Sequence, residues 1–483
     1  MKTFLFVLSL ALIPGFALFA SVYGTHEILT ANGLTSADQV AAICATSHAD
    51  ACGTFGTLQW LFEGSLLALL VNLGLPAVYL VAATILGRDR VWLAHGFPVL
   101  VRVVLSILPV LLAAQGILVW VASWELVQLD IIPSDWRLMV LLAGIGGSLV
   151  LAAITIIADL RRMLEIDPLR VIGVEVEKHE MPALFERVAR IATRLGSREP
   201  ERIIVGIEPN GFIANAPIRL RGVGDLPAAV TLYLPTAAFR VFDDAELDAL
   251  IGHELGHFRG KDLEFTNKFV PAFRSLSVAA NSVTNQGESQ DTVSIALMPA
   301  IGMLSFMMRT IGLIVGRISR ERELAADRAA LEVSTPAAMA SLLVKFSALS
   351  LRWDSFRRGW IRLLHQGTSR RNMSRDYLAH VSQFLGAFDP QKLRQAIVEA
   401  HTPHPLDSHP TLAVRARAVG FDPATVLDPA LAALRIEKPA PAGLEDIEQR
   451  ISQIDADFYR HPASPVVVSD EPELPAELAY VRS

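Results

Sequence analysis

Two histidines and a glutamate stand close together in the stretch LDALIGHELGHFRGKD, residues 247–262. His253 and His257 are four residues apart, and side chains at that spacing project from one face of a helix, one turn above the other. Two neutral imidazoles placed in this way can bind one zinc ion if a third protein ligand joins them and one position stays open for water. Glu254, beside the first histidine, can take a proton from that water. The string alone also fits a helix that carries solvated polar residues.

A second motif, GRISRERELAADRAALEV at 316–333, offers the missing ligand. Glu323 and Asp327 are four residues apart on one helical face, whereas Glu321 points elsewhere. The glutamate can ligate zinc, while the aspartate one turn later can accept a hydrogen bond from a ligand histidine and fix its tautomer. A surface helix with Arg–Glu pairs would explain this motif alone. The two motifs together favour a metal site.

Local signals indicate the elements that position these motifs. Asp243 can cap a helix, with Glu246 as its capping-box partner, so the histidines are predicted to lie on a helix. Residues 181–196 form an amphipathic pattern that ends at a glycine, and 202–208 and 228–235 have the composition of strands. The strand at 228–235 is either an edge strand that pairs with an extended substrate backbone or an internal strand.

Three motifs carry a resemblance to a known family. The pairing of HELGH with SRERELAAD resembles the membrane-bound zinc metalloproteases that include HtpX and the CAAX prenyl endoproteases, peptidase family forty-eight, of the gluzincin type. The stretch SHPTLAVRARAVG (408–420) resembles the family's His-Pro-x-Leu-x-x-Arg element, with His409 and Arg415 in its positions. NGFIANA (210–216) resembles the family's short strand at the border of the cleft. The resemblance covers about 165–420.

The resemblance implies a mainly helical, zincin-like metalloprotease domain with a small β-sheet, of α+β class, and one Zn²⁺ per chain. Glu254 would be the general base, and His409 and Arg415 would contact the substrate or the transition state. The alternative for the last two is structural, a proline-stiffened loop with an arginine bound to a carboxylate. The implied zinc ligands are His253, His257 and Glu323, with Asp327 behind them.

Composition indicates where the chain resides. With 483 residues, 52% of them hydrophobic, and a mean hydropathy of +0.40, the chain is too apolar for an ordinary soluble enzyme. Crossing a hydrocarbon core takes about 20 helical residues, and the apolar runs long enough to do so lie in the first third. These predicted transmembrane helices are about 3–23, 61–86, 97–124 and 137–160.

The distribution of basic residues predicts the orientation. The loop 24–60 has neither lysine nor arginine, whereas Arg88, Arg161 and their basic neighbours fall on the opposite side of the predicted helices. The protein is therefore expected in the plasma (inner) membrane as a multi-pass protein, with its catalytic domain in the cytoplasm. The first run could also be a signal peptide. Cys44 and Cys52 lie in the loop assigned to the outside, where a disulfide can persist, although sequence does not show pairing.

The domain organisation follows from these features: a transmembrane domain at 1–162, a protease domain at 163–435, and a helix with a disordered tail at 436–483. The apolar segment 293–316 lies between the two zinc-binding motifs. A single crossing there would separate the ligands, so the crossings within 258–318 must number zero or two. We favour helices that lie on the inner leaflet over a transmembrane hairpin.

The function expected from the residues is that of a membrane-anchored, zinc-dependent endopeptidase, in membrane protein quality control by resemblance to HtpX. Its expected partners are unfolded or membrane protein substrates and the lipid bilayer. Arginines and aromatic residues alternate through 352–375, but the net charge of −6 argues against a nucleic acid partner. The alternatives are a catalytically silent scaffold or chaperone with a zinc site, and a CAAX-type prenyl-protein protease. Sequence is silent on the oligomeric state.

Overall fold

The structure is a computed structural model whose residues divide into two compact units. One unit comprises Met1–Glu165 with Lys268–Ile314, and the other comprises Ile166–Asn267 with Val315–Ser483. The described residues are 2–45, 50–132, 135–162, 168–259, 276–277, 291–387, 391, 410–459, 467–469, 474–475 and 477–479.

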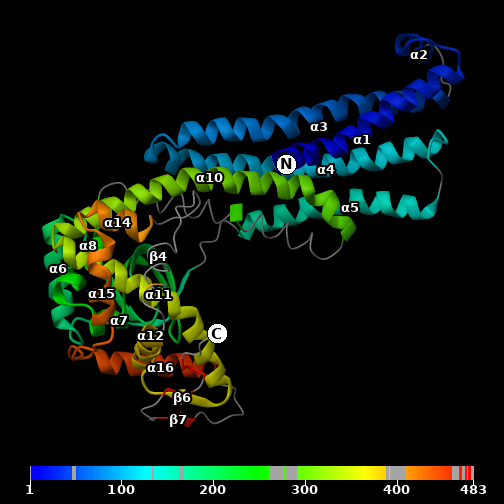
Figure 1. The fold of residues 1–483 in the computed structure, drawn as a ribbon. Helices are drawn as coiled ribbons and strands as arrows, with labels where there is room; N and C mark the ends of the chain where they lie inside the picture. The colour runs from blue at the N-terminus through cyan, green and yellow to red at the C-terminus, as the bar shows by residue number, and fades with distance from the viewer. Residues whose placement is uncertain are drawn as a thin grey trace. The chain divides into compact units, whose positions relative to one another are not determined.

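The N-terminal unit is built from long apolar helices that lie side by side (Figure 1). Each of the four predicted transmembrane helices lies inside one of them, which confirms this part of the fold. Five helices of the described chain are long and apolar enough to span a membrane, and they indicate a multi-pass membrane protein. The helices of the N-terminal part are α1 (Lys2–Ala31), α2 (Ala37–Cys44), α3 (Asp50–Leu86), α4 (Arg90–Gln128) and α5 (Trp136–Arg162).

Two features tie these helices together. Asn72 of α3 donates to the carbonyl of Leu10 on α1 at 2.8 Å, and Gln115 of α4 donates to the side-chain oxygen of Asn72 at 3.0 Å. Such hydrogen bonds join helices in an environment that offers few other polar partners. Cys44 and Cys52 form a disulfide that links α2 to α3, so the pairing left open by the sequence is settled. The membrane side of this disulfide, and with it the orientation of the chain, stays a prediction.

The segment 293–316 belongs to one long helix, α10 (Asp291–Leu331), which also carries Glu323 and Asp327. Up to Ile314 the helix belongs to the N-terminal unit, where Tyr79 of α3 donates a hydrogen bond to the carbonyl of Met307 at 3.2 Å. The fifth candidate span, Ala300–Leu331, lies on this helix. The number of crossings within 258–318 stays a prediction, because most of 260–290 lies outside the described residues.

A five-stranded mixed sheet organises the second unit, in the order β1-β4-β5-β3-β2. β5 is therefore internal, paired with β4 on one side and β3 on the other, and the edge-strand interpretation of 228–235 is wrong. β4 pairs with β1 only through Ile218–Leu220, after an irregularity near Pro217, which has no backbone N–H to donate. The strands are β1 (Leu169–Val171), β2 (Gly173–Glu175), β3 (Arg202–Gly206), β4 (Phe212–Leu220) and β5 (Gly224–Pro235).

Helices cover one face of this sheet and build the main core. Side chains alternate along β3, so Ile203 and Val205 enter the main core, whereas Ile204 enters a smaller cluster on the other face. The mainly helical architecture with a small mixed sheet confirms the predicted fold class. The helices of this unit, besides the end of α10, are α6 (Pro182–Leu195), α7 (Thr236–Val241), α8 (Asp244–Gly256), α11 (Pro336–His365), α12 (Met373–Ala387), α14 (Leu412–Ala418), α15 (Pro423–Ala433) and α16 (Leu444–Tyr459).

The tail, expected to be disordered, is ordered in its described part. β7 (Val467–Ser469) pairs in parallel with β6 (Thr368–Arg370). Leu478 is fully buried in the main core, and its carbonyl lies 2.6 Å from His380 Nδ1. These contacts concern only the described residues of the tail, whose composition indicates disorder.

Candidate metal centre

The first turn of α8 is fixed by an acidic cap. Asp243 accepts a hydrogen bond from the backbone N–H of Glu246 at 2.7 Å, and the Glu246 carboxylate accepts from the backbone N–H of Asp243 at 2.8 Å. The capping box predicted from the sequence is therefore confirmed. Glu246 also accepts hydrogen bonds from Lys345, at 2.6 Å, and from Ser341, both on α11. These contacts anchor the start of α8 inside the unit.

Glycines let the other end of α8 approach α10 closely. A Cβ atom on Gly252 would lie 3.2 Å from Ala330 Cα on α10 and 2.5 Å from Val333 Cγ2 just beyond its end, and one on Gly256 would lie 2.9 Å from Ala329 Cβ. Any side chain at these positions would push the two helices apart. Each glycine directly precedes one of the two histidines, so the close approach brings both imidazoles to the acidic face of α10.

The three predicted ligands converge as a result. The Nε2 atoms of His253 and His257 are 3.2 Å apart, and the Glu323 carboxylate oxygens lie 3.6 Å and 3.5 Å from them. Two ligands at about 2.0–2.1 Å from one zinc ion, in tetrahedral geometry, are separated by about 3.3 Å. All three side chains are largely buried, and lone pairs face one another across the gap. The residues therefore fit a zinc ion.

A second layer holds His253. Its Nδ1 lies 3.0 Å from Asp327 Oδ1, so an N–H there donates to the carboxylate and leaves Nε2 free to bind a metal. Arg415, from α14, grips the same carboxylate with two hydrogen bonds, of 2.9 Å from Nε and 2.6 Å from Nη2. Its Nη1 lies 3.4 Å from a Glu323 oxygen. Arg415 thus makes the arginine–carboxylate contact expected if its role is structural. The other expected role, contact with the substrate or the transition state, stays a prediction.

The surroundings shift the pKa values of the two histidines in opposite directions. Burial lowers the pKa of His253, but the hydrogen bond to Asp327, with help from the charges of Glu323 and Glu254, outweighs burial and raises the pKa above its usual value. Burial, and then the adjacent His253, lower the pKa of His257 to about 3. His257 is therefore neutral at ordinary pH, in the form that binds metals.

Glu254 is buried beside the start of β4. It is 6% exposed, and a Cβ atom on Gly211 would lie 3.1 Å from its Oε1 atom. The carboxylate thus rests beside the backbone at the start of β4. The half of β4 at 212–216 pairs with β5 and has no second partner strand among the described residues. The segment 210–216, which resembles the family's cleft strand, therefore lies next to the candidate base.

The sequence indicated the candidate metal ligands, but not all of the packing that positions them. It placed His253, His257, Glu323 and Asp327 on helices that the structure brings together, while His409 lies outside the described residues. The glycines before each histidine were missed, although their repetition in GHELGH was a visible signal. The anchoring of Glu246 by Lys345, 99 residues later, had no local signal.

Comparison with known proteins agrees with this site. Residues 206–420 match the sequence model of peptidase family M48. A Protease HtpX homolog of Methanopyrus kandleri is 29% identical over 173 residues, which are 34% of this chain and 50% of that protein. Protease HtpX homolog 1 of Streptomyces coelicolor is 30% identical over 179 residues, 36% of this chain and 56% of that protein.

The similarity is confined to part of each protein. A Protease HtpX homolog of Methanocaldococcus jannaschii is 25% identical over 177 residues, and the chain covers 59% of it. The chain thus spans little more than half the length of these relatives. No solved structure matches.

Proposed function

Residues 206–420 belong to peptidase family M48, and from this premise we propose that the chain is a membrane-anchored zinc endopeptidase. The observation that carries the proposal is the convergence of three side chains: the two imidazole Nε2 atoms are 3.2 Å apart, and one Glu323 oxygen lies 3.6 Å from His253 while the other lies 3.5 Å from His257. His253, His257 and Glu323 would hold one Zn²⁺ per chain. When bound, the ion polarises the scissile carbonyl and lowers the pKa of the attacking water.

The chain's own residues supply the remaining chemistry. Glu254 takes the proton of the attacking water and later passes it to the leaving amine. Asp327 keeps the proton of His253 on Nδ1, and the two hydrogen bonds from Arg415 hold the Asp327 carboxylate in place. We therefore assign Arg415 a positioning role, while His409 remains the candidate donor to the oxyanion.

The free edge of β4 suits substrate binding. An extended peptide can add to an exposed strand through main-chain hydrogen bonds, which gives affinity with little sequence preference. Residues 212–216 have no second partner strand among the described residues, and a Cβ atom on Gly211, which precedes them, would lie 3.1 Å from Glu254 Oε1. A peptide on this edge would pass beside the base. We therefore propose that β4, and not the neighbouring segment 228–235, pairs with the extended substrate backbone.

The finer parts of the proposal rest on the resemblance and on the HtpX names of the relatives. We propose quality control of unfolded or membrane proteins as the role, the bilayer as a partner, and the plasma (inner) membrane, with the catalytic domain in the cytoplasm, as the location. A reporter fused after Arg162 should respond as cytoplasmic, and a periplasmic response would overturn the orientation. Prenyl-protein processing is less favoured.

Replacing the candidate base tests the proposal. The protein is purified in detergent with zinc, and cleavage of an unfolded model protein is measured for wild type, Glu254→Gln and Glu321→Gln, an exposed glutamate of α10. We expect Glu254→Gln to lower cleavage by about 10²–10⁴-fold with zinc still bound, and Glu321→Gln to behave as wild type. If zinc-loaded wild type does not cleave the protein, or if all three proteins cleave it equally, the proposed enzymatic activity is contradicted. A scaffold or chaperone would then be favoured.

A further inference from the structure

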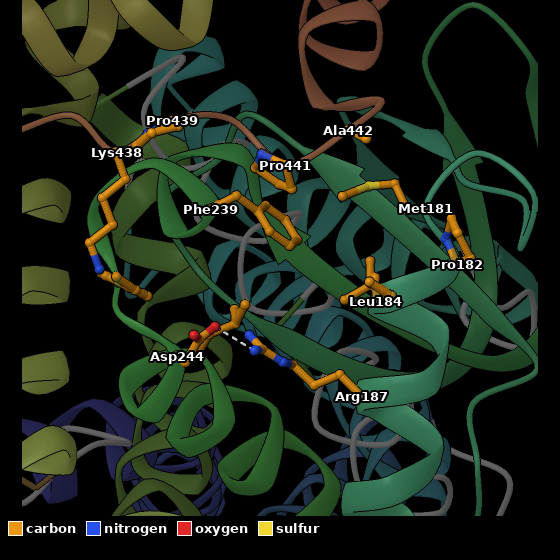
Figure 2. A pocket seen from close by; sticks show the side chains of 13 residues that line it. Met181, Pro182, Leu184, Arg187, Phe239, Asp244, Lys438, Pro439, Pro441 and Ala442 are labelled. Atoms are coloured by element: carbon orange, nitrogen blue, oxygen red, sulfur yellow. Dashed lines mark hydrogen bonds and ion pairs between the residues drawn. The ribbon is translucent and has the colours of Figure 1, made fainter.

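A cavity of about 420 Å³ lies at the opposite end of α8 from the histidines (Figure 2). Its walls come from the starts of α6 and α8, from Phe239 of α7, and from the segment 438–442, which we call the strap. Leu247, in the wall, precedes His253 by six residues, or about 9 Å along the helix. The cavity is therefore separate from the metal centre.

A hydrogen bond holds the start of the strap, and a glycine in close approach to a backbone carbonyl follows its end. The backbone N–H of Lys438 donates to the carbonyl of Arg240 at 2.8 Å. After the strap, Gly443 has a φ of +85°, and a Cβ atom there would lie 2.5 Å from the carbonyl oxygen of Glu180. Only glycine accommodates both the positive φ and that close approach. The strap thus forms a fixed wall.

The lining is apolar with one spare charge. Arg187 pairs with Asp244, the contact drawn in Figure 2, and with Asp248 at 3.3 Å, and Arg190 pairs with Asp248 at 3.0 Å. The positive charges of the two arginines and the negative charges of the two aspartates sum to zero. Lys438 Nζ makes no ion pair or hydrogen bond within the described part of the chain, and it adds one positive charge beside Asp244.

This combination selects the class of ligand. Cavities of about 300–1,000 Å³ with apolar walls and a few polar groups are typical of small-molecule sites. A buried peptide would need partners for each amide, and a wall made of residues such as Met181, Leu184 and Phe239 offers few of them. A single anionic group, in contrast, would be attracted by the Lys438 ammonium.

We propose that this cavity binds a small amphiphilic carboxylate, with its aromatic or alkyl body against the apolar wall and its carboxylate at Lys438. The site is independent of zinc and of proteolysis, and it would place a ligand against the first turns of the helix that bears the candidate metal ligands.

Binding of 4-(4-fluorophenyl)butyrate, measured by ¹⁹F NMR line broadening on the full-length protein in detergent, tests the proposal. The matched neutral probe is the corresponding amide. Ala442→Trp, at an exposed position of the wall, should block the cavity and remove binding of both probes. Lys438→Met should weaken the carboxylate about tenfold and leave the amide unchanged, because only the carboxylate meets the ammonium. Lys178→Met, at an exposed lysine outside the cavity, should match wild type.

The outcomes separate the parts of the proposal. Saturable binding that Ala442→Trp removes and Lys438→Met weakens only for the carboxylate supports it. Equal broadening in wild type and Ala442→Trp means partition into detergent and overturns the site. Equal affinity for carboxylate and amide overturns the ligand class, and no binding by wild type at millimolar probe overturns both. Unchanged thermal unfolding of Ala442→Trp excludes misfolding as the reason for lost binding, and Ala183→Trp, at another exposed wall position, repeats the block if Ala442→Trp does not fold.

Discussion

Two buried acidic clusters in the second unit have opposite surroundings. Asp455 of α16 is fully buried and meets only donors: Arg221, Arg357 at 2.8 Å, and the Trp360 indole N–H at 2.9 Å. Glu323 of α10, also buried, faces the Nε2 atoms of two histidines that also face each other, and Arg415 Nη1 lies 3.4 Å from one of its oxygens. The hydrogen bonds of Asp455 all come from donors, whereas the second cluster brings the acceptor atoms of three side chains to one point.

The difference separates structural from functional burial. A buried carboxylate with a full set of donors is stable where it is, and it ties distant segments together. A buried group of converging acceptors needs a shared cation. Chain position alone does not distinguish the two, because both clusters join residues far apart in sequence. The predictions below test the distinction, from the largest expected effect to the smallest.

Removing a ligand should abolish function without unfolding the protein. In Glu323→Ala we expect zinc content near zero and cleavage at background, because two histidines alone bind zinc weakly. Metal content by atomic absorption and cleavage of an unfolded protein measure this. Chelation of wild type should reproduce the loss, and added zinc should reverse it. Full zinc occupancy in Glu323→Ala would remove this glutamate from the ligand set.

Removing the structural acid should have the reverse effect. Asp455→Ala leaves two arginines and an indole N–H without their acceptor, and we expect a loss of about 3 kcal/mol in the free energy of unfolding. The zinc content of the folded protein should stay at the wild-type level. Asp457→Ala, at an exposed position of the same helix, is the matched control in unfolding measurements. A variant as stable as wild type would show that this cluster contributes nothing.

The residue behind the ligands should have an intermediate effect. Asp327→Asn removes the negative acceptor of His253 Nδ1–H, and we expect zinc affinity to fall about 10–100-fold. Competition with a zinc chelator of known affinity measures the change. Asp354→Asn, at an exposed aspartate of α11, should keep the wild-type affinity. Equal affinities for both variants would contradict the role of Asp327.

A third acid, Glu208, neither has a full set of donors among the described residues nor belongs to the group of converging acceptors. Its replacement should have the smallest effect on stability, and that effect should depend on pH. Burial raises its pKa, although Arg357 and Arg221 partly oppose the shift. The folded protein therefore holds this proton more tightly than the unfolded chain, and the associated stability is lost as pH rises from the ordinary value through the raised pKa.

Glu208→Gln should therefore unfold at a higher temperature than wild type at pH 7, with the advantage shrinking toward pH 4. Calorimetry at both pH values measures this. Glu199→Gln, at an exposed glutamate in the same region, should show no such trend. A stabilisation that is equal at both pH values would mean that the Glu208 proton is not the cause.

Sequence reasoning succeeded where the signal is local and periodic. The apolar runs, the capping box of α8 and the spacing of His253 and His257 follow from nearest neighbours on one helix. It failed where the answer depends on strand order, because nothing within 228–235 says which strands flank it. The bond between Arg415 and Asp327 joins residues 88 positions apart, so the sequence could supply both groups but not their contact.

The glycines that precede each histidine set a limit on transplanting this site. Gly252 and Gly256 supply no ligand, yet they determine how near α10 can come. If only the histidines and the glutamates were copied onto two ordinary helices, side chains at the glycine positions would keep the helices, and with them the ligand atoms, too far apart. A transplanted site would need the two glycines at the contact between the helices as well as the ligand side chains.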